Sequence, residues 1–245
     1  IWMNDTHYSG NSALDGMLRD TALSFQRLLE ALRVLAGDAS QNILDLYAKS
    51  GEVAVSQKSD ASPVTDADHA SHRLICESLT SLTPAIPVLS EESTLEQLIG
   101  RRDWPCCWMI DPLDGTREFL EGTGEFTVNI ALIVDAEAVL GLIAAPNRGY
   151  LDLGVPGWGA RRFPLFSDGP NETLATRPLD PNQPLVMCAS ARHREERVQM
   201  MLSKLSGLAE GAERSNSGSA LKFCDLASGV ADVYPRTSPC YEWDL

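Results

Sequence analysis

Two carboxylates three residues apart, Asp111 and Asp114, end a short apolar segment, and Gly115 and Thr116 follow them directly. Mg²⁺ prefers oxygen ligands and usually takes a few carboxylates together with waters and phosphate oxygens. This segment therefore predicts a magnesium site at a strand end, with the Leu113 carbonyl as a further ligand. Gly115 and Thr116 offer backbone N–H groups at the start of a predicted helical turn, and that position favours a bound phosphate.

Carboxylates elsewhere in the chain strengthen this prediction. Glu91 follows another short apolar strand and supplies a carboxylate from a separate element, as a two-metal centre requires. Asp68 lies at the start of a predicted helix, where a partner for the helix dipole is the simpler interpretation. A D-x-x-D-G motif alone is more often a capped turn than a site, but the neighbouring segments favour a site.

The bulk properties of the 245 residues exclude some classes of protein. A net charge of −14 argues against a broad basic face for a nucleic-acid polymer, so an anionic substrate would need bound cations to reverse the local field. No apolar run is long enough to span a bilayer, so we expect no stable membrane insertion. The six cysteines form no zinc-binding pattern, and we expect buried thiols in a reducing cytosol.

The elements that must position these residues alternate between helix and strand, which predicts a layered α/β architecture. Apolar residues spaced by three and four predict a long helix over about 28–46, and Thr65 or Asp66 caps a second helix. Strands are expected over 87–90, 108–110, 126–135, 138–145, 185–189 and 231–234, and further helices over 194–205 and 218–228. Residues 1–25 are mixed and polar, and look like an extension rather than core. Residues 146–184 show little periodicity.

Several segments together resemble the inositol-monophosphatase-like phosphatases, and more narrowly the CysQ-type 3′(2′),5′-bisphosphate nucleotidases. They occur in order across both halves of the chain, and in combination they are highly specific. The resemblance covers roughly residue 28 to the C-terminus. The segments that carry it are 62–65 (SPVT), 89–92 (LSEE), 111–116 (DPLDGT), 118–119 (EF), 124–132 (GEFTVNIAL), 219–224 (SALKFC) and 234–236 (YPR).

The resemblance implies a fold, an activity and a setting. The fold would be an αβαβα sandwich: an extension over 1–27, an N-terminal α+β domain with the metal-site loops over 28–150, and an incomplete C-terminal α/β domain over 151–245. The activity would be removal of the 3′-phosphate from adenosine 3′,5′-bisphosphate, using two or more Mg²⁺ ions per site and sensitive to lithium. The protein would be cytoplasmic. A homodimer and peripheral attachment at the inner membrane face both stay open.

The resemblance also implies roles for individual residues. Glu91, Asp111 and the Leu113 carbonyl would hold the metal that activates water, while Asp111, Asp114 and Asp244 would hold the metal beside the leaving oxygen. Thr116, paired with Asp68, would accept the proton of the attacking water. The remaining positions would bind the substrate's phosphates or nucleoside: Gly115, His193, Ser219, Lys222 and Arg236.

Two alternatives stay open at this point. One is an inositol monophosphatase or a fructose-1,6-bisphosphatase-like sugar phosphatase of the same superfamily. The other is an inactive, truncated relative that binds nucleotide or metal without turnover. Relatives of this type continue beyond the Trp-Asp pair that ends this sequence at Leu245, so weakened binding at the second metal and reduced activity are expected for these 245 residues.

Overall fold

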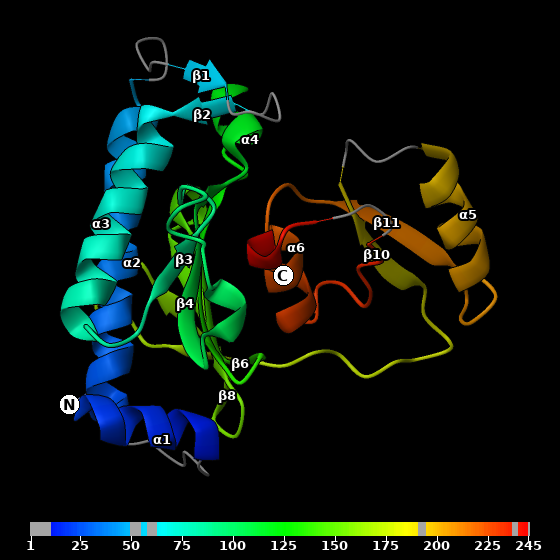
Figure 1. Ribbon diagram of the computed structural model, residues 1–245. Helices are drawn as coiled ribbons and strands as arrows, with labels where there is room; N and C mark the ends of the chain where they lie inside the picture. Colours follow the sequence, from blue (N-terminus) through cyan, green and yellow to red (C-terminus); the bar gives the residue numbers. More distant parts are fainter. Residues whose placement is uncertain (1–10, 50–54, 58–62, 191–194, 237–239, 245) are drawn as a thin grey trace.

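The computed structural model describes residues 11–49, 55–57, 63–190, 195–236 and 240–244, which form successive layers of helix, sheet, helix, sheet and helix (Figure 1). This order confirms the predicted αβαβα sandwich. The α-helices are α1 (Ser12–Thr21), α2 (Phe25–Tyr47), α3 (Asp66–Leu82), α4 (Thr116–Leu120), α5 (Glu195–Leu205) and α6 (Leu221–Ala227). The 3₁₀ helices are η1 (Arg101–Asp103), η2 (Pro146–Arg148) and η3 (Glu242–Asp244).

Seven strands form the main sheet, in the order β3-β4-β5-β6-β7-β8-β9. The first two are parallel, and every later pair is antiparallel, including the predicted β5–β6 hairpin. These strands are β3 (Val88–Ser90), β4 (Cys106–Asp114), β5 (Thr127–Val134), β6 (Glu137–Ala145), β7 (Tyr150–Val155), β8 (Gly159–Pro164) and β9 (Glu172–Leu174). A separate antiparallel pair is β1 (Val55–Gln57) with β2 (Pro63–Thr65).

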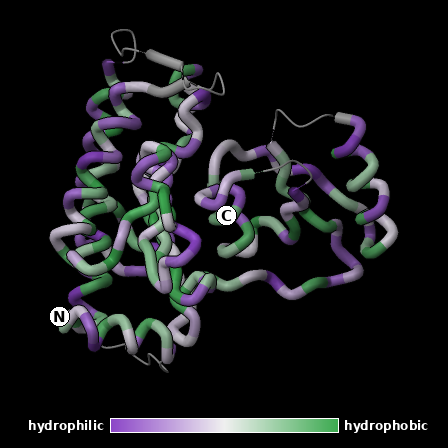
Figure 2. Tube along the Cα trace, viewed as in Figure 1, coloured by the Kyte–Doolittle hydropathy of each residue, from purple (hydrophilic) through white to green (hydrophobic). Residues whose placement is uncertain are grey.

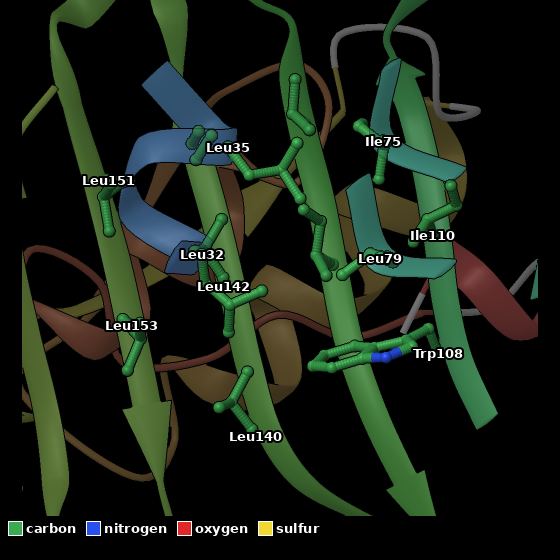
Figure 3. Packing of buried hydrophobic residues seen from close by; sticks show 14 of the residues in the cluster. Leu32, Leu35, Ile75, Leu79, Trp108, Ile110, Leu140, Leu142, Leu151 and Leu153 are labelled. Carbon is green, nitrogen blue, oxygen red and sulfur yellow. The ribbon is translucent and has the colours of Figure 1, made fainter. Parts of the chain in front are cut away.

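Helices α2 and α3 cover one face of this sheet, and the main core lies between them and the strands (Figure 3). Hydrophobic and hydrophilic stretches alternate along both helices, as amphipathic helices require (Figure 2). Leu32 of α2 and Ile75 of α3 are fully buried against the sheet. On the strand side, the buried Trp108 ring donates its Nε1–H to Thr83 Oγ1 at 2.8 Å, which satisfies its one polar group inside the core.

The start of α3 confirms the predicted cap. Thr65 is the N-cap residue, and its hydroxyl accepts from the N–H groups of Ala67 and Asp68. Asp68 in turn accepts from the Thr65 N–H at 2.7 Å, which completes a capping box. This reciprocal pair fixes the first turn of α3, and therefore the direction in which Asp68 points.

The N-terminal residues differ from the prediction. Residues 12–21 form α1, which begins at an Asn11 cap, and its Leu14, Met17 and Leu18 are buried in the same core as α2. The expectation that residues 1–25 lie outside the core was wrong for this helix. Although the segment is mostly polar, Leu14, Met17 and Leu18 are spaced by three and four residues, so they lie on one buried face of the helix.

The segment over 146–184 also differs from the prediction, since it contains β7, β8 and β9. The main sheet therefore continues to Leu174, and the boundary predicted between residues 150 and 151 cuts across it. The predicted division of the chain stays a prediction, and a boundary after Leu174 fits the sheet better.

The second unit is a small parallel sheet, β10 (Leu185–Ala189) with β11 (Ala212–Asn216), which α5 and α6 contact. The predicted strand over 185–189 is confirmed, whereas β11 was missed. The strand predicted over 231–234 is reduced to a single bridge between Met187 and Val233, and the helix predicted from Gly218 begins at Leu221. None of the described helices combines the length and the apolar character needed to cross a membrane.

Candidate metal centre

The parallel pairing of β3 and β4 brings two of the predicted ligands to one edge of the sheet. Ser90 pairs with Ile110, so Glu91, directly after β3, lies beside Asp111 of β4. The Glu91 N–H donates to the Ile110 carbonyl at 3.1 Å, which holds this end of β3 against β4. The geometry of a parallel pair thus joins two carboxylates that lie 20 residues apart in the sequence.

Asp111 lies in a field of other carboxylates. It is 2% exposed, and burial raises its pKa well above the ordinary range for aspartate. The nearby charges of Asp114, Glu91 and Asp244 raise this pKa further, as does a hydrogen bond with Glu91. A buried carboxylate among like charges is unfavourable without a cation, so this environment fits a metal ligand.

A bulge in β4 separates Asp111 from Asp114. Asp111 pairs with Asn129 and Asp114 pairs with Thr127, so β4 has one more residue than β5 in this stretch. Inside the bulge, the Leu113 N–H donates to Asp111 Oδ1 at 3.2 Å, and Pro112 has no N–H to leave unpaired. The bulge is what allows both aspartates to approach one point.

Gly115 then turns the chain into α4. Its φ of +92° lies in the left-handed region, and a Cβ at this position would be 2.9 Å from the Glu125 carbonyl oxygen. Only glycine fits both the backbone angle and the close approach. The predicted phosphate-binding role of the Gly115 and Thr116 N–H groups stays a prediction.

Thr116 and Asp68 are paired, as the resemblance implied. The Thr116 hydroxyl donates to Asp68 Oδ1 at 2.9 Å and is also 3.3 Å from the Leu113 carbonyl. The other oxygen of Asp68 accepts from the N–H and the hydroxyl of Thr65 at 2.7 and 2.6 Å. Asp68 is 1% exposed, so the helix cap and the metal loop are joined through one buried carboxylate.

The second unit contacts the site through the loop before α6. Ser219 Oγ donates to Asp114 Oδ2 at 2.7 Å. Lys222 is 5% exposed, and its Nζ donates to the carbonyls of Ser217 and Ser219. Burial raises the pKa of Asp114, whereas the Ser219 hydrogen bond and the Lys222 charge lower it, so both residues favour the charged carboxylate. In this structure Lys222 Nζ donates to protein carbonyls. The predicted contact between Lys222 and a phosphate stays a prediction.

Asp244 lies near the same carboxylates but has a cationic partner of its own. Its Oδ2 accepts from Arg236 Nη2 and from the Tyr241 N–H, each at 3.1 Å. The predicted metal-ligand role of Asp244 and the predicted nucleotide contact of Arg236 would each require this ion pair to open. His193, also predicted to bind substrate, lies outside the described residues.

The donor set suits a hard divalent cation, because the converging groups are carboxylate and carbonyl oxygens. Within the described residues, no three His, Cys, Asp or Glu side chains are yet gathered closely enough to hold one ion. The rotamers of these side chains would therefore have to change on binding. Asp114 and Asp244 are held by protein donors, and Asp111 shares a hydrogen bond with Glu91.

A cavity of about 660 Å³ adjoins the site on the face of the sheet away from α2 and α3. Its wall includes Asn129 and Gly141 from the sheet, Ala220 directly before α6, Phe223 within α6, and Asp244 of η3. This volume lies within the range of small-molecule sites.

Sequence reasoning missed two residues of α3 that support the metal loops. Ser71 is fully buried, and its hydroxyl donates to the Pro112 carbonyl at 2.8 Å. His72 Nδ1 is 2.8 Å from Ser90 Oγ, directly before Glu91. Both residues lie three or four positions after Asp68, so helical periodicity places all three on one face and could have identified them.

Comparison with known proteins identifies the family of the chain. Residues 25–245 match the inositol monophosphatase family. The chain belongs to this family, as the sequence motifs predicted.

Within the family, the chain is similar to several CysQ proteins. It is 38% identical over 218 residues to the 3′(2′),5′-bisphosphate nucleotidase CysQ of Salmonella typhimurium, covering 89% of this chain and 83% of that protein. The Escherichia coli K12 protein of the same name is 37% identical over the same shares. A crystal structure of CysQ from Bacteroides thetaiotaomicron superposes with a TM-score of 0.73 at 35% identity, covering 90% of this chain and 83% of that one.

Proposed function

We propose that this chain is a metal-dependent phosphomonoesterase that removes the 3′-phosphate of adenosine 3′,5′-bisphosphate, giving AMP and inorganic phosphate. The observation that carries this proposal is that Glu91, directly after β3, lies beside Asp111 of the parallel strand β4. Asp114 ends β4, and Thr116, at the start of α4, is hydrogen-bonded to Asp68. The similarity to nucleotidases of the CysQ type over most of the chain supports the choice of substrate.

The residues that would hold the cations are Glu91, Asp111 and Asp114 with the Leu113 carbonyl, and Asp244 for the ion beside the leaving oxygen. We propose two or more Mg²⁺ ions, because the donors are hard oxygens from separate elements. Bound divalent cations supply Lewis-acid stabilisation of the charge that builds on the phosphate and its leaving oxygen. Phosphoryl transfer depends mainly on positioning and on this kind of charge stabilisation.

The protein's own acid–base contribution comes from Thr116. The Thr116 hydroxyl donates its proton to Asp68 Oδ1, and the two oxygens are 2.9 Å apart. A lone pair of Thr116 Oγ1 therefore remains for a water on the other side of the hydroxyl. As that water attacks phosphorus, Thr116 accepts its proton while passing its own towards Asp68. The three hydrogen bonds that hold Asp68 keep this pair in place.

The test is phosphate release from adenosine 3′,5′-bisphosphate with Mg²⁺, after EDTA treatment, and in Asp111→Asn. We expect release only with metal and intact Asp111, with AMP as the nucleotide product. Asp168→Asn, at an exposed position away from the site, is the matched control and should behave as wild type. Release that persists after metal removal would refute the mechanism, and a higher kcat/KM on inositol 1-phosphate would refute the substrate. The homodimer and the attachment to a membrane surface remain predictions.

A further inference from the structure

One serine of the second unit makes a direct hydrogen bond to a predicted metal ligand of the first. Ser219 Oγ is 2.7 Å from Asp114 Oδ2 and 3.0 Å from the Asp114 carbonyl oxygen, although the two residues lie 105 positions apart. A serine hydroxyl has one proton. The shorter distance and the negative charge assign that proton to the carboxylate, where the hydrogen bond is charge-assisted.

Thr127 supports this serine from the neighbouring strand. Its Oγ1 is 2.7 Å from Ser219 Oγ and 2.9 Å from Asn129 Oδ1, and the residue is fully buried. Thr127 is also the strand partner of Asp114 across the bulge. The side-chain oxygens of Thr127, Ser219 and Asp114 therefore form one chain of close contacts that ends on the carboxylate.

The backbone is held in an uncommon conformation to make this contact. Ser219 has a φ of +51°, in the left-handed region that residues other than glycine and asparagine rarely adopt. Gly218 beside it donates its N–H to Glu125 Oε2 at 3.0 Å, and a Cβ on Gly218 would be 2.9 Å from Glu125 Cβ. Strain of this kind persists only where the surroundings fix it, and it concentrates at functional sites.

The backbone N–H of Ala220, the next residue of the loop, also lowers the pKa of Asp114. The Ser219 hydrogen bond sets the rotation of the Asp114 carboxylate. In this arrangement the Ser219 proton is committed to Asp114, which leaves no proton for a substrate phosphate.

From these contacts we infer that Ser219 is a positioning residue, which orients the Asp114 carboxylate for the cation and makes metal affinity depend on docking of the 217–220 loop. The inference rests on the metal site of the proposed function, and it concerns binding of the metal rather than the choice of substrate. It also replaces direct phosphate binding as the role of Ser219.

The experiment is calorimetric titration of the substrate-free protein with Mg²⁺. Supporting partners of metal ligands typically contribute about 10- to 100-fold in affinity, so Ser219→Ala should raise the Mg²⁺ Kd by about that factor. Ser219→Gly loses the same hydroxyl but relaxes the positive φ. It should therefore lose a similar factor in metal affinity while melting at a higher temperature than Ser219→Ala. Thr127→Val should show a smaller loss in the same direction.

Ser217→Ala is the matched control in the same loop. Its hydroxyl donates to Asp225 Oδ2 at 2.7 Å and does not reach Asp114, so its removal should lower stability with little change in Mg²⁺ Kd. Unchanged Mg²⁺ affinity in both Ser219 variants, or an equal loss in Ser217→Ala, would overturn the inference. A wild-type protein that binds Mg²⁺ but releases no phosphate from adenosine 3′,5′-bisphosphate would refute the proposed function and leave this inference standing.

Discussion

Replacing Asp111 by asparagine should stabilise the metal-free protein while it abolishes activity. The Asp111 carboxylate is 2% exposed, and its charged form is opposed by burial and by the charges of Asp114, Glu91 and Asp244. Asparagine keeps the size and the Oδ1 acceptor for the Leu113 N–H, but it carries no charge. Removing one poorly compensated buried charge should raise the free energy of unfolding by about 1–3 kcal/mol. For a chain of this size, a gain of about 2 kcal/mol raises Tm by roughly 4–8 °C.

The pH dependence of this gain follows from the direction of the pKa shift. Because the pKa of Asp111 is raised in the folded state, protonation of Asp111 favours the folded state, and this contribution is fully present below the ordinary aspartate pKa. The contribution is lost as the pH rises through the raised pKa. Wild type and Asp111→Asn should therefore melt at similar temperatures at low pH. The advantage of the variant should grow as pH increases.

The assay is thermal denaturation in EDTA at several pH values, repeated with excess Mg²⁺. Metal should stabilise wild type and have little effect on Asp111→Asn, because a ligand that binds only the folded state shifts Tm through its affinity. Asp168→Asn is again the control at an exposed position and should follow wild type throughout. A metal-free Asp111→Asn that melts below wild type at neutral pH, or a difference that does not change with pH, would refute the reasoning.

Three further substitutions test other parts of the structure. Thr116→Val removes the hydroxyl that faces Asp68 and should lower kcat by about 10²- to 10⁴-fold with little change in Mg²⁺ Kd; unchanged kcat would exclude the proton-transfer role. Leu14→Ala should lower the free energy of unfolding by about 2–5 kcal/mol in denaturant titrations, whereas Val34→Ala, at a position 59% exposed, should change it little. Trp108→Phe should reduce stability by about 1–3 kcal/mol, since it removes the donor to Thr83, and an unchanged unfolding midpoint would show that this bond contributes nothing.

Local signals in the sequence were enough to predict α2, α3 and the strand that leads into Asp111. The buried positions of α2 repeat every three or four residues, and Thr65 with Asp68 is a capping box whose two partners are both visible in the sequence. Asp111 and Asp114 lie together at the end of an apolar run. In each case the information lies within a few residues, so no knowledge of distant contacts was needed.

The strands after residue 146 were missed because their pattern depends on pairing partners. Arg162 looks like a loop residue, but it lies opposite Asp152 and forms an ion pair with it at 2.7 Å, so a charged side chain occupies a strand. On the neighbouring strand, Asp152 is buried between Leu151 and Leu153, and this burial depends on its pairing with Arg162 across the sheet. The contact between Ser219 and Asp114 was missed for a similar reason, since the two residues lie 105 positions apart.

A crystal structure of the protein with Ca²⁺ in place of Mg²⁺ tests the central claim most directly. We expect Ca²⁺ bound by carboxylate oxygens of both Glu91 and Asp111 at about 2.3–2.6 Å, with Asp114 turned towards a neighbouring ion. An ordered Ca²⁺ on other residues, with the Glu91 and Asp111 oxygens uncoordinated at saturating metal, would contradict the account.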